Sequence, residues 1–394
     1  GAPRVAVAMG AAKSACAGGC FSGLRTVRKQ DDADWLDPFS DASATAAQKA
    51  EPLRVAVAGA AGQIGYALLP MIASGEMFGK GQRVILQCLD LNLPQVIENM
   101  RGLEMELQDG DFPLLREAFF TVDDAKAFKD ADYVILLGAF PQQEGKQRRE
   151  IMEKNTMIFR TMGHAIETCA NKECKVLTVA HPACTNALLC AYYAPSRPKE
   201  NFFALSRLEQ NRVAGQIAQR ASASADDVRN VAVWGVSPSA RRADLDTCTV
   251  KGKPLFSALY KEDDRKWLEQ ELAPDVLQRG ASIHQARKAT CALSAARAIV
   301  GHMRDLHCGT RPGIFSSMGV WSDGNEYGIA DGLVFSMPVV CQGRGRWHMA
   351  GGLVVGKETR ERLKEAEREL LGDRELAREL GRKHGLQLAQ MSKA

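Results

Sequence analysis

The sequence is poor in histidine and lacks several features that would assign a protein to a function class directly. Seven histidines occur among 394 residues, and none lies between His181 and His284. No apolar run is long enough to span a bilayer, which argues against a membrane-spanning protein. The eleven cysteines include no Cys-x-x-Cys pair or other metal-ligand spacing, so no metal site is predicted. The net charge of +4 is too small to indicate binding to nucleic acid.

The composition indicates a globular chain with a substantial core. Hydrophobic residues make up 45% of the sequence and charged residues 25%, and a chain of this length buries most of its apolar surface on folding. Cys88 and Cys190 lie in apolar stretches, so we predict that they are reduced core thiols. Cys16 and Cys20, separated by Ala-Gly-Gly, form the candidate redox pair.

A strand, a glycine-rich turn and a helix are predicted near residue 60. The segment VAVAGAAGQIG spans residues 55–65, so an apolar strand leads into Gly-x-x-Gly-x-x-Gly. Glycines at these positions permit a tight turn and let a pyrophosphate approach the N–H groups at the start of the helix. The segment therefore predicts a dinucleotide-binding loop.

The residue that follows the next strand selects between the two nicotinamide cofactors. A second apolar strand over residues 84–89 ends at Asp90, where a carboxylate can bind the ribose 2′-hydroxyl. Because Asp90 would repel a 2′-phosphate, the predicted cofactor is NAD. The predicted cofactor-binding residues are Gly59, Gly62, Gln63, Ile64, Gly65 and Asp90.

Several long stretches resemble the malate dehydrogenase family, in particular its cytosolic and chloroplast branches. They read GAAGQIGYALLPMIASGEMFG, MELQDGDFPLL, APSRPKENFFALSRLEQNRVAGQIA, NVAVWG, LQRGASI and GVWSDGNEYGIADGLVFSMPVV, and they cover roughly residues 53–375. The resemblance implies an α/β fold, with an N-terminal Rossmann doubly wound parallel sheet followed by a mixed α/β substrate domain. It also implies assembly as a homodimer.

The chain is predicted to have four parts. We expect an N-terminal extension over residues 1–50, an NAD-binding Rossmann domain over 51–205 and a substrate and dimerisation domain over 206–372. Apolar residues at helical spacing predict an amphipathic helix before Gly372, which is expected to break it. Residues 373–394 are then a charged helical extension, either solvated or serving as a docking arm.

The catalytic pair of the resembled family is altered in this sequence. In that family a histidine held by an aspartate exchanges the proton with the substrate oxygen, because an imidazole titrates near neutrality. Here Ser237, within WGVSPSARRADL, replaces the histidine, and Glu209 replaces the aspartate. Loss of a general acid is expected to cost at least about 10²-fold in rate. Without an imidazole to orient, Glu209 is predicted to brace Arg212.

The substrate-binding positions are partly retained. The family uses arginines to clamp the two substrate carboxylates, because a guanidinium binds a carboxylate with two parallel hydrogen bonds. In the loop PQQEGKQRRE, Gln142 replaces the first arginine of the family. Arg148 retains the second arginine, as a substrate ligand or as a solvated loop cation. Arg212 is also kept. The strand-end motif reads HPACTN, which places His181 where the family has an asparagine that contacts the substrate oxygen.

Four substitutions thus fall on one small site, and they favour a catalytically inactive protein. They are Gln142, His181, Glu209 and Ser237. We expect a malate dehydrogenase-like structural or NAD-sensing subunit of an organellar assembly, whose protein partners bind the N- and C-terminal extensions. The alternative is an active NAD-dependent dehydrogenase for malate or another 2-hydroxy acid, with a rearranged site in which His181 supplies the proton.

The first thirty residues predict an organelle-targeting segment. They contain no acidic residue, and five basic residues lie among alanine, valine, glycine and serine, a composition that resembles a transit peptide. The chloroplast branch also has a cysteine-bearing N-terminal extension, so a plastid is predicted, with a mitochondrion as the alternative. The C-terminal cysteine pair of that branch is absent, because no cysteine follows Cys341.

Overall fold

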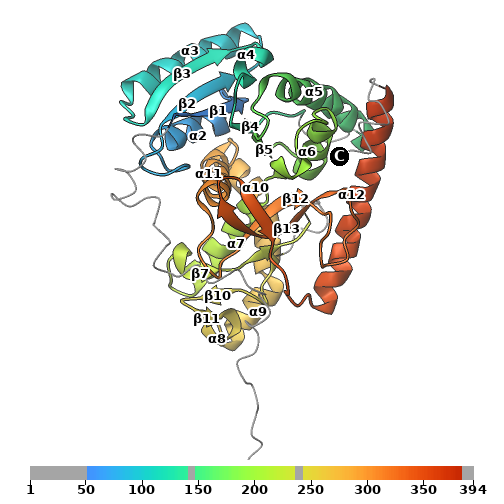
Figure 1. Ribbon diagram of the computed structural model, residues 1–394. Coiled ribbons are helices and arrows are strands. Elements are labelled where there is room, and N and C mark those ends of the chain that lie inside the picture. The colour runs from blue at the N-terminus through green and yellow to red at the C-terminus, as the bar shows by residue number, and fades with distance from the viewer. Residues whose placement is uncertain (1–50, 141–146, 236–242, 384–394) are drawn as a thin grey trace, which may run out of the picture.

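The computed structural model describes residues 51–140, 147–235 and 243–383. The predictions for Cys16, Cys20, Gln142 and Ser237 therefore concern residues outside the described ranges. Helices cover both faces of a long central sheet, and α5, α6 and α12 lie together on the side away from α2 and α3 (Figure 1).

The central sheet has nine strands in the order β14-β13-β12-β6-β5-β4-β1-β2-β3. The six strands from β3 to β6 are parallel, and β12, β13 and β14 add to the β6 edge in antiparallel pairs. The order 3-2-1-4-5-6 of the parallel part is that of a Rossmann fold, which confirms the predicted fold class. The strands are β1 Leu53–Ala58, β2 Val84–Leu89, β3 Leu115–Thr121, β4 Tyr133–Leu136, β5 Lys175–Thr178, β6 Phe202–Ala204, β12 Ser316–Trp321, β13 Val334–Gly343 and β14 Arg346–Met349.

Helices connect the parallel strands and then build the second half of the chain. Those of the first half are α2 Gln63–Ala73, α3 Pro94–Asp109, α4 Asp124–Phe128, α5 Arg148–Cys169 and α6 Ala183–Tyr192. Those of the second half are α7 Arg207–Arg220, α8 Leu255–Ala258, α9 Glu262–Gln270, α10 Leu272–Arg287, α11 Ala292–Cys308 and α12 Lys357–Lys383. Short 3-10 turns occur at η2 Lys199–Asn201 and η3 Ala225–Asp227.

Two hydrophobic cores hold these elements together. Central strands such as β1 and β4 are apolar and buried, as parallel strands covered by helices on both faces must be. The main core extends from β1 and α2 through β6 to β13 and α12, and the predicted core thiols Cys88 and Cys190 are both buried in it. A smaller core lies between α7, α9, α10 and the short strands. The short strands are β7 Val228–Arg229, β8 Ala232–Val233, β9 Ala243–Asp244, β10 Thr249–Val250 and β11 Lys253–Pro254. Of these, β7 and β10 contribute buried residues to the smaller core.

The C-terminal helix differs from its prediction. Helix α12 runs without interruption from Lys357 to Lys383, so the expected break at Gly372 is wrong. Glycine costs a helix interior about 1 kcal/mol relative to alanine, but Ala377 and Leu380 beyond it are buried against the rest of the molecule. Burial of this face stabilises the helix by more than the glycine destabilises it. Among the described helices, none is both long and apolar enough to cross a membrane.

Candidate active site

The glycine-rich turn between β1 and α2 has the conformation that its sequence predicts. Gly59 has φ +88°, a left-handed conformation that glycine adopts without strain. The N–H groups of Gly59 and Ala60 both donate to the Leu89 carbonyl, 2.8 and 3.2 Å away, which fixes the turn beside the end of β2. Helix α2 then begins at Gln63, with its N-terminus at the turn.

Gly65 and Asp90 complete the turn from opposite sides. A Cβ atom on Gly65 would lie 2.1 Å from the Ala60 carbonyl oxygen, so only glycine lets the helix approach the loop this closely. Asp90 follows β2, and its Oδ2 accepts a 2.8 Å hydrogen bond from the Ala61 N–H. The structure thus brings together the glycines and the acid that the sequence predicts at one cofactor site.

Gln63 makes a contact that the sequence did not predict. Its Oε1 accepts hydrogen bonds from the N–H and the hydroxyl of Thr290, 3.1 and 2.9 Å away. Thr290 lies in the turn between α10 and α11, in the second half of the chain. The contact joins the predicted cofactor loop to the part of the molecule predicted to bind the substrate. Ile64, beside Gln63, packs against the main core.

His181 lies just after β5, at the carboxyl end of the parallel sheet, where ligands of such folds bind. It is exposed, and its Nδ1 is 3.3 Å from the Val179 carbonyl oxygen. Since a carbonyl only accepts, Nδ1 carries the proton in this contact. The next residue, Pro182, follows a cis peptide bond and precedes α6.

Helix α7 carries the two remaining predicted residues, Glu209 and Arg212. Glu209 is buried, and its Oε1 has no hydrogen-bond partner in the described part of the chain. Arg212 is half-buried; its Nη2 lies 3.4 Å from the Cys291 sulfur, and its Nε has no partner within the described ranges. No hydrogen bond or ion pair joins Glu209 to Arg212 among the described residues, so the predicted bracing contact is not formed.

These two side chains have the signature of a ligand site. Buried polar groups are almost always hydrogen-bonded in folded proteins, so an orphaned buried atom calls for a ligand or for ordered water. A half-buried guanidinium whose described neighbour is a thiol fits an anionic ligand best. Cys291, like Thr290, comes from the α10–α11 turn, and sequence analysis missed both because no motif singles them out.

Arg148, the retained arginine of the loop, is engaged by the C-terminal helix. Its Nη2 lies 2.6 Å from Oδ1 of Asp373, and Oδ2 of Asp373 accepts a 2.8 Å hydrogen bond from the Thr185 hydroxyl. The Asp373 side chain is 6% exposed, while that of Arg148 is 58% exposed. The Arg148 guanidinium therefore binds a buried carboxylate of the protein itself. The sequence had predicted that Arg148 binds the substrate or is a solvated cation.

Comparison with known proteins matches nearly the whole described chain. Residues 53–203 match the family model for the lactate/malate dehydrogenase NAD binding domain, and residues 206–380 match that for the alpha/beta C-terminal domain. A cytoplasmic malate dehydrogenase of Beta vulgaris is 44% identical over 330 residues, covering 83% of this chain and 98% of the relative. That of Rattus norvegicus is 43% identical over 328 residues, covering 83% and 97%.

A solved structure shows the same fold with a cofactor. The Trichomonas vaginalis lactate dehydrogenase in complex with NADH and oxamate superposes with a TM-score of 0.76 at 32% identity, covering 84% of this chain and 99% of that one. Together with the NAD binding domain match, this shows that residues 53–203, which include the glycine turn and Asp90, form an NAD-binding domain.

The curated relatives overturn the predicted location. The plastid predicted from residues 1–30 is wrong, because the Beta vulgaris and Rattus norvegicus relatives are both named cytoplasmic. The composition of a short segment carries less information than similarity over more than three hundred residues. The segment itself lies outside the described ranges.

Proposed function

The chain belongs to the lactate/malate dehydrogenase family, and we propose that it is a working NAD-dependent dehydrogenase that interconverts a small 2-hydroxy acid and its 2-oxo acid. Malate and oxaloacetate are the first pair to test, because the curated relatives are named malate dehydrogenases. The sequence alone favours an inactive subunit and predicts this activity only as the alternative. When bound, NADH would supply the hydride and NAD would accept it in the reverse direction; the chain's own residues must hold the substrate and move the proton.

The proposal rests on the burial and the hydrogen bonding of the Arg212 side chain. Its guanidinium is half-buried beside Cys291, and its Nε has no hydrogen-bond partner among the described residues. A substrate carboxylate would satisfy these donors with two charge-assisted hydrogen bonds. The Cys291 side of the site also lies next to Thr290, which contacts Gln63 of the cofactor loop. Substrate and cofactor would therefore meet at the α10–α11 turn.

His181 is the residue to which we assign the proton transfer. Formation of the 2-hydroxy acid requires a proton at the ketone oxygen, and an imidazole exchanges protons near neutral pH. Because Nδ1 of His181 faces the Val179 carbonyl, Nε2 is the nitrogen that exchanges the proton. The residue follows β5 at the ligand-binding end of the sheet.

A steady-state assay of the full chain tests the proposal. NADH oxidation is measured with oxaloacetate and with pyruvate, since a site that has lost a carboxylate ligand would favour the smaller acid. Arg212→Gln is expected to raise KM about ten- to a hundredfold, the loss of a charge-assisted contact. Arg360→Gln, which removes the same charge from an exposed position on α12, is expected to leave KM unchanged. His181→Gln is expected to lower kcat about 10²- to 10⁴-fold.

Two results would contradict the proposal. Turnover below about 1 s⁻¹ with every 2-oxo acid tried would place the chain under the range of ordinary enzymes. Equal KM values for the Arg212 and Arg360 variants would remove Arg212 from substrate binding.

The second candidate is a protein that binds NAD without turning over a substrate and serves as a subunit of a larger assembly. This candidate is supported by the ion pair between Asp373 and Arg148. It is also supported by Gln142 and Ser237, which replace the arginine and the histidine of the family. It predicts that NADH binds, that no 2-oxo acid is reduced, and that His181→Gln changes nothing. Measuring NADH binding by fluorescence beside the activity assay separates the two candidates.

We further propose a homodimer in the cytoplasm. The location follows from the names of the curated relatives. Dimerisation is supported by three exposed apolar side chains, Tyr66 on α2, Met105 on α3 and Leu293 on α11, which are 55%, 59% and 63% exposed. They line one shared groove, and an apolar surface of this kind typically marks an interface. Light scattering of the full chain gives the oligomeric state, and Met105→Glu is expected to shift it toward the monomer.

A further inference from the structure

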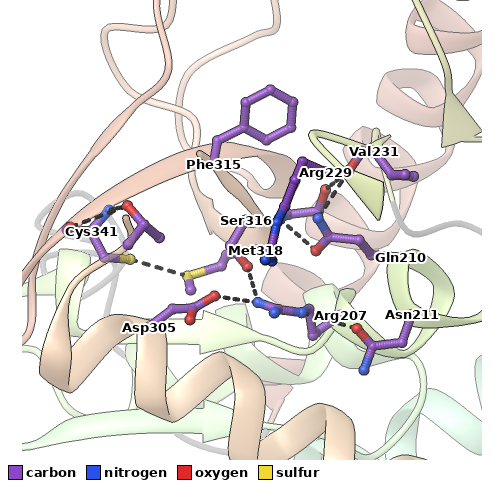
Figure 2. Close-up of polar contacts among 12 residues, drawn as sticks. Arg207, Gln210, Asn211, Arg229, Val231, Asp305, Phe315, Ser316, Met318 and Cys341 are labelled. Carbon is purple, nitrogen blue, oxygen red and sulfur yellow. Dashed lines mark hydrogen bonds and ion pairs between the residues drawn. The ribbon is translucent and has the colours of Figure 1, made fainter. Parts of the chain in front are cut away.

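A basic cavity lies away from the proposed active site. It has a volume of about 190 Å³ and is enclosed by the start of α7, the end of α11, the loop after α11 and the segment around β7. Figure 2 shows its inner wall, where Arg207 lies between Asp305 and Asn211, with Gln210 and Arg229 beside it. The five arginines that line the cavity are Arg207, Arg229, Arg297, Arg304 and Arg311.

The cavity is separate from the cofactor and substrate sites. Along the 17-residue helix α11, Arg304 and Cys308 lie about 18 and 24 Å from the α10–α11 turn that contacts the cofactor loop, whereas Arg297 lies in the second turn of the helix. Arg207 and Arg212 both belong to α7, but five residues rotate the helix by about 140° net, so the two guanidinium groups leave it on different faces. The cavity thus shares a helix with the proposed substrate site without sharing its residues.

Positive charge dominates the lining. Two carboxylates of the lining, Asp226 and Asp305, face the five guanidinium groups, and Glu76 pairs with Arg297, which leaves a formal charge of +2. Burial lowers the pKa of Arg304, and the neighbouring Arg297 and Arg207 lower it further, whereas Asp305 opposes this. The ion pairs with Asp305, Asp226 and Glu76 therefore neutralise only part of the formal positive charge of the lining.

The rest of the wall is fixed and offers few competing acceptors. Arg207 forms an ion pair with Asp305 and donates to the Ser316 hydroxyl at 2.5 Å and to the Asn211 side chain at 3.1 Å. The two amide side chains of the lining are used by the backbone: Gln210 bonds to Val231 and Ser317, and Asn230 bonds to Gly313 and Phe315. Each guanidinium has five N–H donors, so Arg207, Arg229 and Arg297, which pair with Asp305, Asp226 and Glu76, have further donors to offer a ligand.

We propose that this cavity binds a small phosphate-type dianion, either inorganic phosphate or the phosphoryl group of a small metabolite. Guanidinium groups reach the cavity from α7, β7, α11 and the loop after α11, and an anion with oxygens in several directions can accept from all of them. A carboxylate has two oxygens with acceptor sites in one plane, whereas a phosphate has oxygens in several directions. The volume of about 190 Å³ lies below the range of about 300–1,000 Å³ typical of pockets for larger ligands, so the cavity suits a phosphate better than a nucleotide.

Calorimetric titration of the full chain with inorganic phosphate, at constant ionic strength set by chloride, tests the site. The native chain is expected to bind phosphate saturably. The double variant Arg229→Gln/Arg311→Gln is expected to bind it about tenfold more weakly or worse, since two charge-assisted contacts are lost. The control Arg116→Gln/Arg360→Gln removes the same charge from exposed positions elsewhere and should change affinity by no more than about twofold.

The same titration with and without saturating NADH separates this site from the cofactor loop, which also favours phosphate. Binding that persists with NADH and is lost in the Arg229/Arg311 variant supports the proposal. Displacement of phosphate by NADH, equal weakening in both double variants, or affinity no greater than for chloride would overturn it. Glycerol 3-phosphate serves as the second probe: if it binds as tightly as the free ion, the ligand is the phosphoryl group of a metabolite, and if only inorganic phosphate binds, the ligand is the free ion.

Discussion

Arg148 and Asp373, 225 positions apart in the sequence, form a 2.6 Å ion pair that fastens the first residue of α5 to the C-terminal helix. The pair is not isolated. Arg149 lies 2.5 Å from Glu379, and Lys383 pairs with Glu153, so three ion pairs connect the start of α5 with the last turns of α12. Residues 141–146, which contain Gln142, directly precede this connection. The C-terminal helix therefore holds Arg148 and Arg149, which follow residues 141–146 in the predicted substrate loop.

Asp373→Asn is expected to destabilise the chain by about 1 kcal/mol. Thr185 can still bond to the amide, whereas the ion pair is lost, and solvent at the exposed Arg148 limits its strength. Urea unfolding of Asp373→Asn, Arg148→Gln and the double variant gives the coupling energy. Additive losses would show that the two side chains do not interact.

Gly65→Ala is expected to weaken NADH binding by at least about tenfold, because its Cβ would clash with the Ala60 carbonyl oxygen at 2.1 Å. Fluorescence titration with NADH measures the change. Gly372→Ala is the matched control, since nothing lies within 4 Å of the added Cβ. Equal affinities for the two variants would mean that the loop does not bind the cofactor in this conformation.

Gly372→Ala is itself expected to stabilise the chain by about 0.5–1 kcal/mol, the helix-interior difference between the two residues. The position is exposed within an unbroken helix, so only backbone entropy changes. Gly332→Ala provides the contrast, because φ is +75° there and alanine is strained. Thermal unfolding distinguishes the two, and a loss of stability from Gly372→Ala would show that the helix breaks there.

Stability is expected to decrease as the pH falls from 6.5 toward 3. Burial lowers the pKa of His302 to about 3, and Arg207 lowers it further. Its ordinary value is about 6.5, so between these two values the unfolded chain binds a proton that the folded chain does not. This histidine alone contributes a slope of up to about 1.4 kcal/mol per pH unit.

His302→Leu should reduce that slope, because the buried imidazole has no hydrogen-bond partner among the described residues and its loss leaves none unpaired. Urea unfolding at several pH values measures it. His284→Leu, at an exposed position, is the control. An unchanged slope in His302→Leu would assign the acid sensitivity to other groups.

The cofactor half of the molecule could be predicted because its signals are local. The glycines of the turn and the strands around it lie within forty residues, and each has one conformation compatible with the pattern. The contacts that define the rest of the site are not local. Gln63 and Thr290 are 227 positions apart, and no pattern in either segment specifies the pairing.

The C-terminal helix shows why local preference alone fails. Gly372 predicts an end on propensity grounds, but the buried face beyond it, with Ala377 and Leu380, decides the outcome. The role of Arg148 was open for a similar reason, because its partner Asp373 lies near the other end of the chain. The arginine cavity was not predicted at all, since its side chains come from separate elements that only the fold brings together.

The pairing of β6 with β12 has a consequence for how this molecule can be divided. Gly319 lies so close to Ala204 that a Cβ there would be 2.6 Å from the alanine side chain, and through this pair one sheet continues from the first matched region into the second. One hydrophobic core crosses the same boundary. The two halves are therefore not independent domains. Neither can be excised, exchanged with a homologous half or expressed alone without exposing the unpaired backbone groups of a sheet edge. Both halves should unfold in a single cooperative step.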